Sequence, residues 1–231
     1  VEHTSQEEIA VCNLASLCLP KFVNNDGTFN YEELGRITRI ITRNLNVVIN
    51  ANFYPIEETW NSNNKNRPVG LGVQGLADVY IKMNLSFESL EAMEVNKKIF
   101  ECIYYHSLLE SNELAKEYGH YKTFKGSPFS EGILQFHMWG KTLDDMNKEL
   151  NYDWCSLIDN IKIYGTLNSL ITSIMPTAST AQIMGNNESI EPYASNIYVR
   201  KTLSGEYLVV NKNLIEDLRK INMWDRKTYS E

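Results

Sequence analysis

The feature that most restricts the fold of this chain is a short apolar segment, residues 170–175, that ends at Pro176. It has the length and composition of a buried strand, and a proline cannot continue a sheet because it has no N–H group to donate. Residues 178–184 behind the proline can wind into a helix. A strand that leads into a helix is typical of α/β proteins, which commonly bind ligands at the carboxyl ends of their strands.

Two long helices are predicted from the spacing of apolar residues. Between residues 30 and 50, leucine, isoleucine and valine recur at intervals of three and four positions, as on the buried face of an amphipathic helix. A second helix is expected from Ser86 or Glu88 to Tyr118, with Gly119 as its carboxyl-terminal cap. These two helices are long enough to cover a sheet or a barrel.

The remaining predicted elements are shorter. Residues 9–20 are expected to form a buried strand followed by a short helix, and the polar run at residues 61–68 is expected to form a loop. Two strands at residues 196–203 and 207–210 flank a turn and predict a β-hairpin, behind which a last helix starts at Lys212. No repeat or linker divides the chain, so the mixture of helices and separated strands indicates an α/β fold without a visible domain boundary.

Composition excludes several classes of protein. The net charge is −7 over 231 residues, whereas sequence-independent binding of nucleic acid or of an anionic membrane needs a basic surface. No apolar run approaches the ~20 residues of a membrane span, and the first residues lack the pattern of a signal peptide. We therefore expect a cytoplasmic protein without nucleic-acid or membrane partners. Because the chain starts at Val1 and not at a methionine, we also consider it a piece of a longer protein.

The segment behind Pro176 carries the strongest indication of function. Thr177, Ser179 and Thr180 stand at the start of the helix predicted at residues 178–184, where hydroxyl residues commonly serve as N-caps. Capping alone explains their presence. A second interpretation adds a ligand, because free N–H groups at a helix start, several hydroxyls and small side chains suit a phosphate group. The residues alone leave both interpretations open.

Other reactive residue types give weaker signals. The four cysteines contain no Cys-x-x-Cys pair and the four histidines have no metal-ligand spacing, so no metal site is predicted. Cys12 stands in an apolar run and is interpreted as a small buried side chain. Tyr104 and Tyr105 lie in the middle of the longer helix, where we expect them to pack against the core.

Two further patterns are set aside. Glu188 and Glu191 resemble a catalytic carboxylate pair, but acids in a polar loop are more simply solvated or capping residues. The spacing of Gly70, Gly72 and Gly75 resembles a dinucleotide-binding fingerprint. That fingerprint requires a strand, a turn and a helix with an acid ~20 residues further on, and we do not expect this unit here.

Five separated segments match one family in order along the chain. They are residues 8–16 around Cys12, residues 67–78, residues 98–101 with Tyr104 and Tyr105, residues 132–136, and residues 175–192. With these segments the chain resembles, from end to end, the large catalytic subunit of class I ribonucleoside-diphosphate reductase of the eukaryotic type.

The resemblance implies a fold and a reaction. Residues 1–231 are expected to be the C-terminal portion of the catalytic barrel domain, part of a ten-stranded α/β barrel with long covering helices. Enzymes of this family reduce ribonucleoside diphosphates to 2′-deoxyribonucleoside diphosphates for DNA precursor synthesis. They do so by thiyl-radical chemistry with a redox dithiol.

The resemblance also implies roles for individual residues. Thr177, Ala178, Ser179 and Thr180 match the family's phosphate loop and are expected to hold the diphosphate of the substrate. Cys12 matches one of the two redox-active thiols that end as a disulfide, and a dithiol suits this task because it supplies two electrons and is then reset by exchange.

Partners are implied in the same way. A metal-containing small subunit is expected to supply the radical, and a thioredoxin- or glutaredoxin-type protein the reducing electrons. Large subunits are expected to form a homodimer, with ATP and deoxynucleotide effectors bound outside this segment. The radical cysteine, the second redox cysteine and the radical-relay tyrosines are expected beyond residues 1–231. We therefore expect no cofactor within the chain and no activity from it alone. The alternative is a non-catalytic scaffold or binding module that retains the fold.

Overall fold

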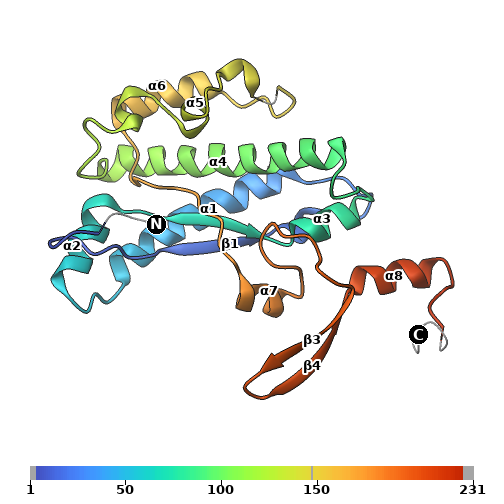
Figure 1. Ribbon diagram of the computed structural model, residues 1–231. Helices are drawn as coiled ribbons and strands as arrows, with labels where there is room; N and C mark the ends of the chain where they lie inside the picture. Colours follow the sequence, from blue (N-terminus) through green and yellow to red (C-terminus); the bar gives the residue numbers. More distant parts are fainter. Residues whose placement is uncertain (1–3, 147, 226–231) are drawn as a thin grey trace.

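A layer of parallel strands lies at the centre of the molecule (Figure 1). The computed structural model describes residues 4–146 and 148–225. Strands β1 (Leu14–Cys18) and β2 (Gly70–Gln74) pair in parallel, with Leu14 opposite Gly70 and Cys18 opposite Gln74. A third segment, residues 170–175, runs along the other edge of β2 and is joined to it by a parallel bridge between Leu71 and Thr172. The order of the layer is thus β1, β2 and the third segment.

Two long helices, α1 (Tyr31–Ala51) and α4 (Leu90–Tyr118), pack against each other and lie along this layer (Figure 1). Asn30 and Ser89 cap their first turns, each accepting a hydrogen bond from a backbone N–H three residues further on. Gly119 ends α4 at a φ of 85°, a conformation that side chains disfavour. Both predicted helices are confirmed, although α4 begins a few residues later than expected.

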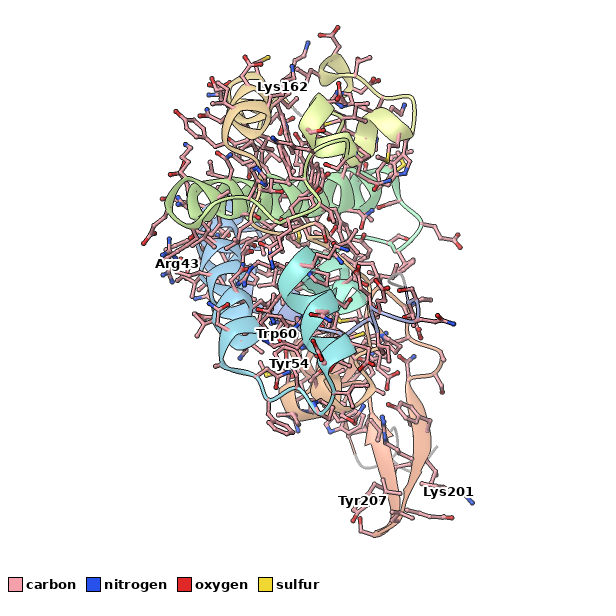
Figure 2. The ribbon with its side chains drawn as sticks, turned by 90° about the vertical axis from the view of Figure 1, so that its left-hand side faces the viewer. Arg43, Tyr54, Trp60, Lys162, Lys201 and Tyr207 are labelled. Atoms are coloured by element: carbon pink, nitrogen blue, oxygen red, sulfur yellow. The ribbon has the colours of Figure 1, made fainter. Side chains whose placement is uncertain are left out.

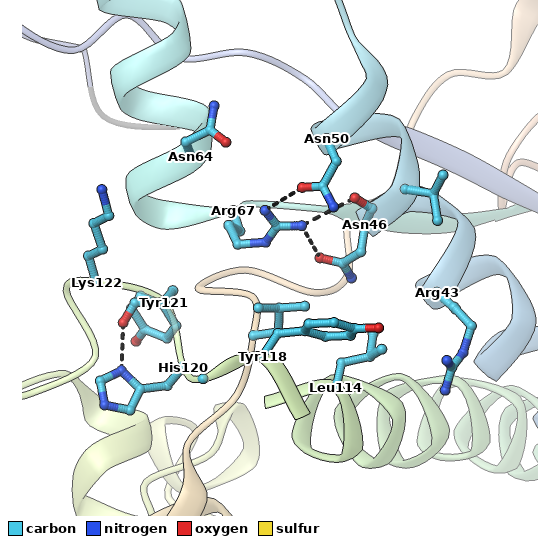
Figure 3. Close-up of a pocket in the computed structure, with 13 residues that line it drawn as sticks. Arg43, Asn46, Asn50, Asn64, Arg67, Leu114, Tyr118, His120, Tyr121 and Lys122 are labelled. Carbon is cyan, nitrogen blue, oxygen red and sulfur yellow. Dashed lines mark hydrogen bonds between the residues drawn. The ribbon is translucent and has the colours of Figure 1, made fainter. Parts of the chain in front are cut away.

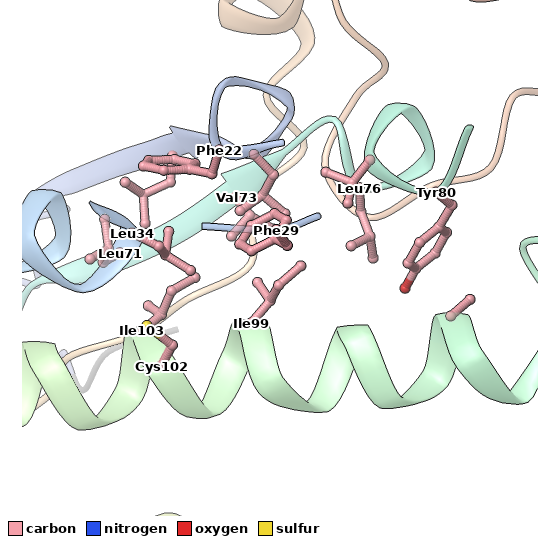
Figure 4. Close-up of a cluster of buried hydrophobic side chains, with 14 residues drawn as sticks. Phe22, Phe29, Leu34, Leu71, Val73, Leu76, Tyr80, Ile99, Cys102 and Ile103 are labelled. Carbon is pink, nitrogen blue, oxygen red and sulfur yellow. The ribbon is translucent and has the colours of Figure 1, made fainter. Parts of the chain in front are cut away.

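The main hydrophobic core lies between these helices and the strands (Figure 4). Leu71 and Val73 of β2 face Leu34 of α1 and Ile99 and Ile103 of α4, and all five are almost fully buried. Burial of a leucine, isoleucine or valine contributes about 1.5–3 kcal/mol. This core therefore fixes β2, the central strand, against the helices.

A second core lies on the other side of α4, under a layer of short helices. Its main members are α6 (Trp154–Tyr164) and α5 (Gln135–Met138), which contribute the buried rings and aliphatic chains of Trp154, Ile161 and Phe136. Tyr104 and Tyr105 pack against this cluster, as predicted. Trp139, just after α5, lies outside this core, with 70% of its surface exposed.

The other elements connect these layers and extend from them. Short 3₁₀ helices are η1 (Leu19–Phe22), η2 (Pro128–Glu131) and η3 (Leu143–Asp145), and the remaining helices are α2 (Glu57–Asn66), α3 (Leu76–Lys82), α7 (Ala178–Met184) and α8 (Lys212–Lys220). The predicted hairpin is confirmed as antiparallel strands β3 (Ile197–Thr202) and β4 (Gly205–Val210). It projects from the body of the molecule, with Lys201 and Tyr207 near its tip (Figures 1 and 2).

Three local predictions are corrected by the structure. Residues 61–66, expected in a loop, belong to helix α2, and the glycine-rich segment of β2 is a strand that sequence did not predict. Residues 170–175 do not form the predicted buried strand: a single parallel bridge at Thr172 joins them to β2, only Ile171 is enclosed, and Leu170 and Ile174 are about half exposed. The segment has a covered edge along β2 and an uncovered face.

Buried amides hold the start of the third segment in place. Asn168 donates 2.9 Å to the side-chain oxygen of Asn46 on α1 and 2.7 Å to the carbonyl of Arg67. Its own oxygen accepts from Asn46 and from Ser111 on α4. Because buried polar groups need hydrogen-bond partners, these bonds fix the position of Asn168 and so the point at which the third segment begins beside β2.

The described residues contain two separate two-stranded sheets and no closed one. The ten-stranded barrel expected from the resemblance is therefore not seen in this segment. No helix among residues 4–146 and 148–225 combines the length and apolar character needed to cross a bilayer.

Candidate functional site

The carboxyl ends of the three parallel segments lie on the same side of the strand layer, and each leads into a helix. β1 continues into η1, β2 passes through Gly75 into α3, and the third segment passes through Pro176 and Thr177 into α7. The close approach of the third segment to β2 requires Gly72, since a Cβ there would stand 2.3 Å from the carbonyl oxygen of Ser173. The hydroxyl-rich residues thus occupy the edge of the layer at which α/β proteins commonly bind ligands.

Thr177 begins α7 in a rare backbone conformation. Its φ is 55°, in the left-handed region that β-branched residues seldom occupy. The Thr177 hydroxyl does not cap α7; its oxygen instead accepts a 2.8 Å hydrogen bond from the backbone N–H of Ser189. The capping interpretation is therefore wrong for Thr177. The hydroxyl proton is left to donate elsewhere.

The next three residues present donors to solvent. Ala178, Ser179 and Thr180 are all exposed, and their backbone N–H groups meet no acceptor in the part of the chain that the structure describes. The Thr180 hydroxyl donates weakly, at 3.3 Å, to the Thr177 carbonyl. Unpaired N–H groups carry partial positive charge, and together with neighbouring hydroxyl donors they suit the binding of an anion.

A cation from the hairpin lies next to this turn. Arg200 of β3 donates to the carbonyl of Ala178 at 3.4 Å and forms an ion pair with Glu188 at 3.3 Å. Arg200 was not predicted from the sequence, because it stands about twenty residues beyond the turn and belongs to a different element. Glu188, for which no catalytic role was predicted, acts here as the partner of Arg200.

Gly75 explains the glycine spacing that sequence analysis set aside. β2, Gly75 and α3 do form a strand, a turn and a helix, so that reason for dismissing the pattern is wrong. Gly75 has a φ of 78°, and a Cβ there would stand 2.7 Å from the ring of Pro20 and 3.1 Å from Asn186. The glycine thus allows η1 and the end of α7 to pack closely around the carboxyl ends of the strands.

Cys12 lies away from this turn, before the amino end of β1. Its side chain is exposed, so the prediction of a buried cysteine is wrong. The next residue, Asn13, is buried and donates to Asn63 at 2.6 Å and to the carbonyl of Pro68 at 2.9 Å. The backbone beside Cys12 is therefore fixed while its thiol is open. The structure does not bring Cys12 into contact with residues 177–180.

A cavity of about 470 Å³ lies elsewhere, among α1, α2 and the end of α4 (Figure 3). Arg67 crosses it, donating to Asn50 at 2.8 Å and to Asn46 at 3.2 Å, and burial lowers the pKa of its guanidinium. No residue of the hydroxyl-rich turn lines this cavity. Among the described residues, no three histidine, cysteine or carboxylate side chains stand close enough to hold a metal ion.

A parallel strand layer with a hydroxyl-rich turn at its carboxyl ends defines an α/β protein whose exposed donors have the chemistry that suits an anionic ligand. Comparison with known families identifies the class further. The model of the ribonucleotide reductase barrel domain matches residues 1–231, which is the whole chain. The chain belongs to this family.

Several known proteins similar to the chain are named as the large subunit or large chain of ribonucleoside-diphosphate reductase. The ribonucleoside-diphosphate reductase large subunit of Danio rerio is 52% identical over 227 residues, and that of Caenorhabditis elegans 51% identical over 224 residues. The large chain of Cryptosporidium parvum is 52% identical over 226 residues. Each alignment covers 97–98% of this chain but only 28% of the relative's length.

Proposed function

We propose that this chain is the portion of a class I ribonucleoside-diphosphate reductase large subunit that seats the diphosphate of the substrate. The whole enzyme would convert ribonucleoside diphosphates to 2′-deoxyribonucleoside diphosphates. One observation carries the proposal: the turn at Thr177–Thr180 presents unpaired N–H groups and hydroxyls at the carboxyl ends of parallel strands. The relatives' shared name supports the reaction, and their greater length leaves the rest of the machinery to other parts of the protein.

The proposed seat holds the diphosphate by hydrogen bonds and dipoles. The N–H groups of Ala178, Ser179 and Thr180 and the hydroxyls of Thr177 and Ser179 are its donors. Hydrogen bonds to charged oxygens contribute about 1.5–3 kcal/mol each, so a few of them suffice for micromolar binding. Arg200 adds a positive charge beside Ala178 without entering the turn.

Cys12 is proposed as one of two redox thiols. Its exposed thiol and rigid flanking backbone suit a group that must meet both the substrate and a second cysteine. In the net reaction two thiols give up two electrons and two protons and become a disulfide, while the 2′-hydroxyl leaves as water and a C–H bond replaces it. A thioredoxin- or glutaredoxin-type dithiol would then reduce the disulfide by exchange.

The remaining parts of the proposal lie outside the described strands. With the rest of the protein, β1, β2 and the third segment would complete a ten-stranded barrel of which residues 1–231 are one portion without a separate domain boundary. A radical-generating small subunit, a second large subunit and nucleotide effectors are the proposed partners, in the cytoplasm.

The proposal is tested on the full-length enzyme by changing Ser179 and Thr180 together to alanine. Loss of the Ser179 hydroxyl donor, and of the Thr180 hydroxyl that bonds to the Thr177 carbonyl within the turn, is expected to raise the KM for a ribonucleoside diphosphate at least about tenfold, because a lost bond to a charged oxygen costs about 1.5 kcal/mol or more. Ser156→Ala is the matched control, since Ser156 is an exposed hydroxyl residue in the first turn of α6. An unchanged KM in the double variant would show that residues 179 and 180 do not hold the diphosphate. A full-length protein that binds no nucleoside diphosphate would support the non-catalytic alternative.

A further inference from the structure

A buried carboxylate stands behind the proposed diphosphate seat. Asp78 of α3 is 4% exposed and accepts three hydrogen bonds. Its Oδ1 accepts from the Tyr193 hydroxyl at 2.6 Å and from the Asn213 side-chain nitrogen at 2.8 Å, and its Oδ2 accepts from the Asn187 backbone N–H at 2.7 Å. All three donors are neutral, and no lysine or arginine pairs with Asp78 in the described residues.

The three donors come from three different segments. Asn187 follows α7, Tyr193 lies in the connection to the hairpin, and Asn213 is in the first turn of α8. They stand 109, 115 and 135 residues from Asp78 in sequence. A buried carboxylate is costly unless hydrogen bonds satisfy it. The three segments are therefore held together beside α3 by their hydrogen bonds to Asp78.

A short series of hydrogen bonds connects this point to the seat. The N–H of Leu76, on the same helix as Asp78, donates to the carbonyl of Ser189 at 3.4 Å. The N–H of Ser189 in turn donates to the Thr177 hydroxyl oxygen at 2.8 Å. Asp78 and Leu76 therefore hold residues 187–189, and Ser189 holds Thr177.

The conformation of Thr177 shows that such support is needed. A threonine at a φ of 55° is strained, and strained residues persist only where their surroundings fix them. The bond from Ser189 is the contact that retains the Thr177 side chain in this orientation. If residues 187–189 moved, Thr177 would relax and the N–H groups of the next three residues would turn away from a common point.

We propose that Asp78 is a positioning residue for diphosphate binding, acting through residues 187–189 on Thr177–Thr180 without touching the substrate. The inference rests on the proposed function of that turn. It assigns to Asp78 an effect on substrate affinity and none on the chemical step. Tyr193 and Asn213 share the same task, because each donates to the same carboxylate oxygen.

The test is Asp78→Asn in the full-length enzyme, with KM and kcat measured for one ribonucleoside diphosphate. An asparagine keeps the shape but turns an N–H₂ group toward a donor, which breaks at least one of the three bonds. KM is expected to rise at least about tenfold, as for a lost bond to a charged group, while kcat at saturating substrate stays within about threefold. Asp159→Asn, an exposed carboxylate on α6, is the control and leaves both unchanged.

Combination with the seat variant separates positioning from general destabilisation. If Asp78 acts through the seat, Asp78→Asn raises KM much less in the Ser179→Ala, Thr180→Ala background than in the wild type. The inference would be overturned if the combined variant raised KM by the product of the two separate increases, or if Asp78→Asn lowered kcat at unchanged KM.

Milder variants cover the case in which Asp78→Asn does not fold. Tyr193→Phe and Asn213→Ala each remove one donor and are expected to raise KM about two- to fivefold, with kcat unchanged. Unchanged KM in both overturns the positioning role. The two proposals fail separately: if the seat variant raises KM and the Asp78, Tyr193 and Asn213 variants do not, the seat stands and the positioning role is wrong. If the seat variant leaves KM unchanged, the seat is wrong and the inference falls with it.

Discussion

Gly72 offers a direct test of how the strand layer places the proposed seat. A Cβ added at this position would lie 2.3 Å from the carbonyl oxygen of Ser173 and 2.7 Å from the end of the Met175 side chain. Real Cβ atoms essentially never come closer than 3.0 Å to another heavy atom, so the Ser173 backbone must retreat by about 0.7 Å. The methionine end can swing away, but the backbone cannot.

The consequence of that retreat follows from hydrogen-bond geometry. Ser173 is tied to β2 through a 3.2 Å bond from its N–H to the Leu71 carbonyl, and it stands four residues before Thr177. A shift of about 0.7 Å would stretch that bond, and would stretch a phosphate hydrogen bond of about 2.9 Å beyond the range in which it counts as one. Overpacking adds about 1–3 kcal/mol of destabilisation. Gly72→Ala is therefore expected to raise the KM for a ribonucleoside diphosphate at least tenfold.

The assay is initial-rate kinetics on the full-length enzyme, together with the temperature of half-inactivation. Gly70→Ala is the matched control on the same strand, because its Cβ would meet the flexible end of the half-exposed Leu14 side chain and would stand 3.0 Å from the Ser173 Cβ, so that Ser173 has to give by only a few tenths of an ångström. Its KM is expected to stay within about threefold of the wild type. If Gly72→Ala matched the wild type in both KM and heat stability, the third segment could not lie against β2 as described.

Two further predictions concern acid stability and redox chemistry. Burial lowers the pKa of His106 to about 4, against about 6.5 in an unfolded chain. Between these two pH values the unfolded state binds a proton at this histidine and the folded state does not. The free energy of unfolding therefore falls as the pH drops from about 6.5 to about 4. Heat inactivation measured across this window should depend less on pH in His106→Leu than in the wild type or in the His120→Leu control, and equal slopes would show that His106 does not contribute. Cys12→Ser in the full-length enzyme should abolish turnover driven by a dithiol protein while substrate binding is retained, whereas Cys155→Ser, at the other exposed cysteine, should change neither. Undiminished turnover of Cys12→Ser would exclude Cys12 from the redox pair.

The elements that sequence predicted well are those with local signals. Helix α1 has a three-four apolar pattern and its own cap at Asn30, and the hairpin has a glycine-containing turn between two β-branched and aromatic runs. Helix α7 was predicted with its observed bounds, since Pro176 and Gly185 delimit it. In each case the information needed lies within a few residues of the element.

The elements that were not predicted correctly depend instead on contacts between residues far apart in the sequence. Helix α2 consists mostly of polar residues and ends in an asparagine-rich run with poor helix propensity, and its Asn63 finds its partners in Asn13, fifty residues away, and in Tyr54. Strand β2 is rich in glycine and is a strand because β1 and the third segment enclose it. Tertiary contacts override propensity at both places.

The residues of the proposed seat likewise differ in how far the sequence alone reveals their roles. Its hydroxyls and small residues are visible in the sequence, and so is their position behind a strand. The roles of the residues around them are not, because Thr177 bonds to Ser189 rather than to its own helix, Arg200 contacts the turn from β3, and Asp78 binds Asn187 from α3. Local chemistry therefore indicates which groups bind, whereas long-range packing decides how they are oriented.

The partners of Asp78 also set an order of events during synthesis. The strands and the turn at residues 177–180 are made before Tyr193 and Asn213, which donate to the same oxygen of the Asp78 carboxylate. While those residues are still inside the ribosome, the carboxylate lacks two of its three donors and favours water over burial. On this proposal the turn is fully held only after the first turn of α8 has emerged, so a nascent chain stalled before residue 213 should bind a diphosphate more weakly than the longer chain does.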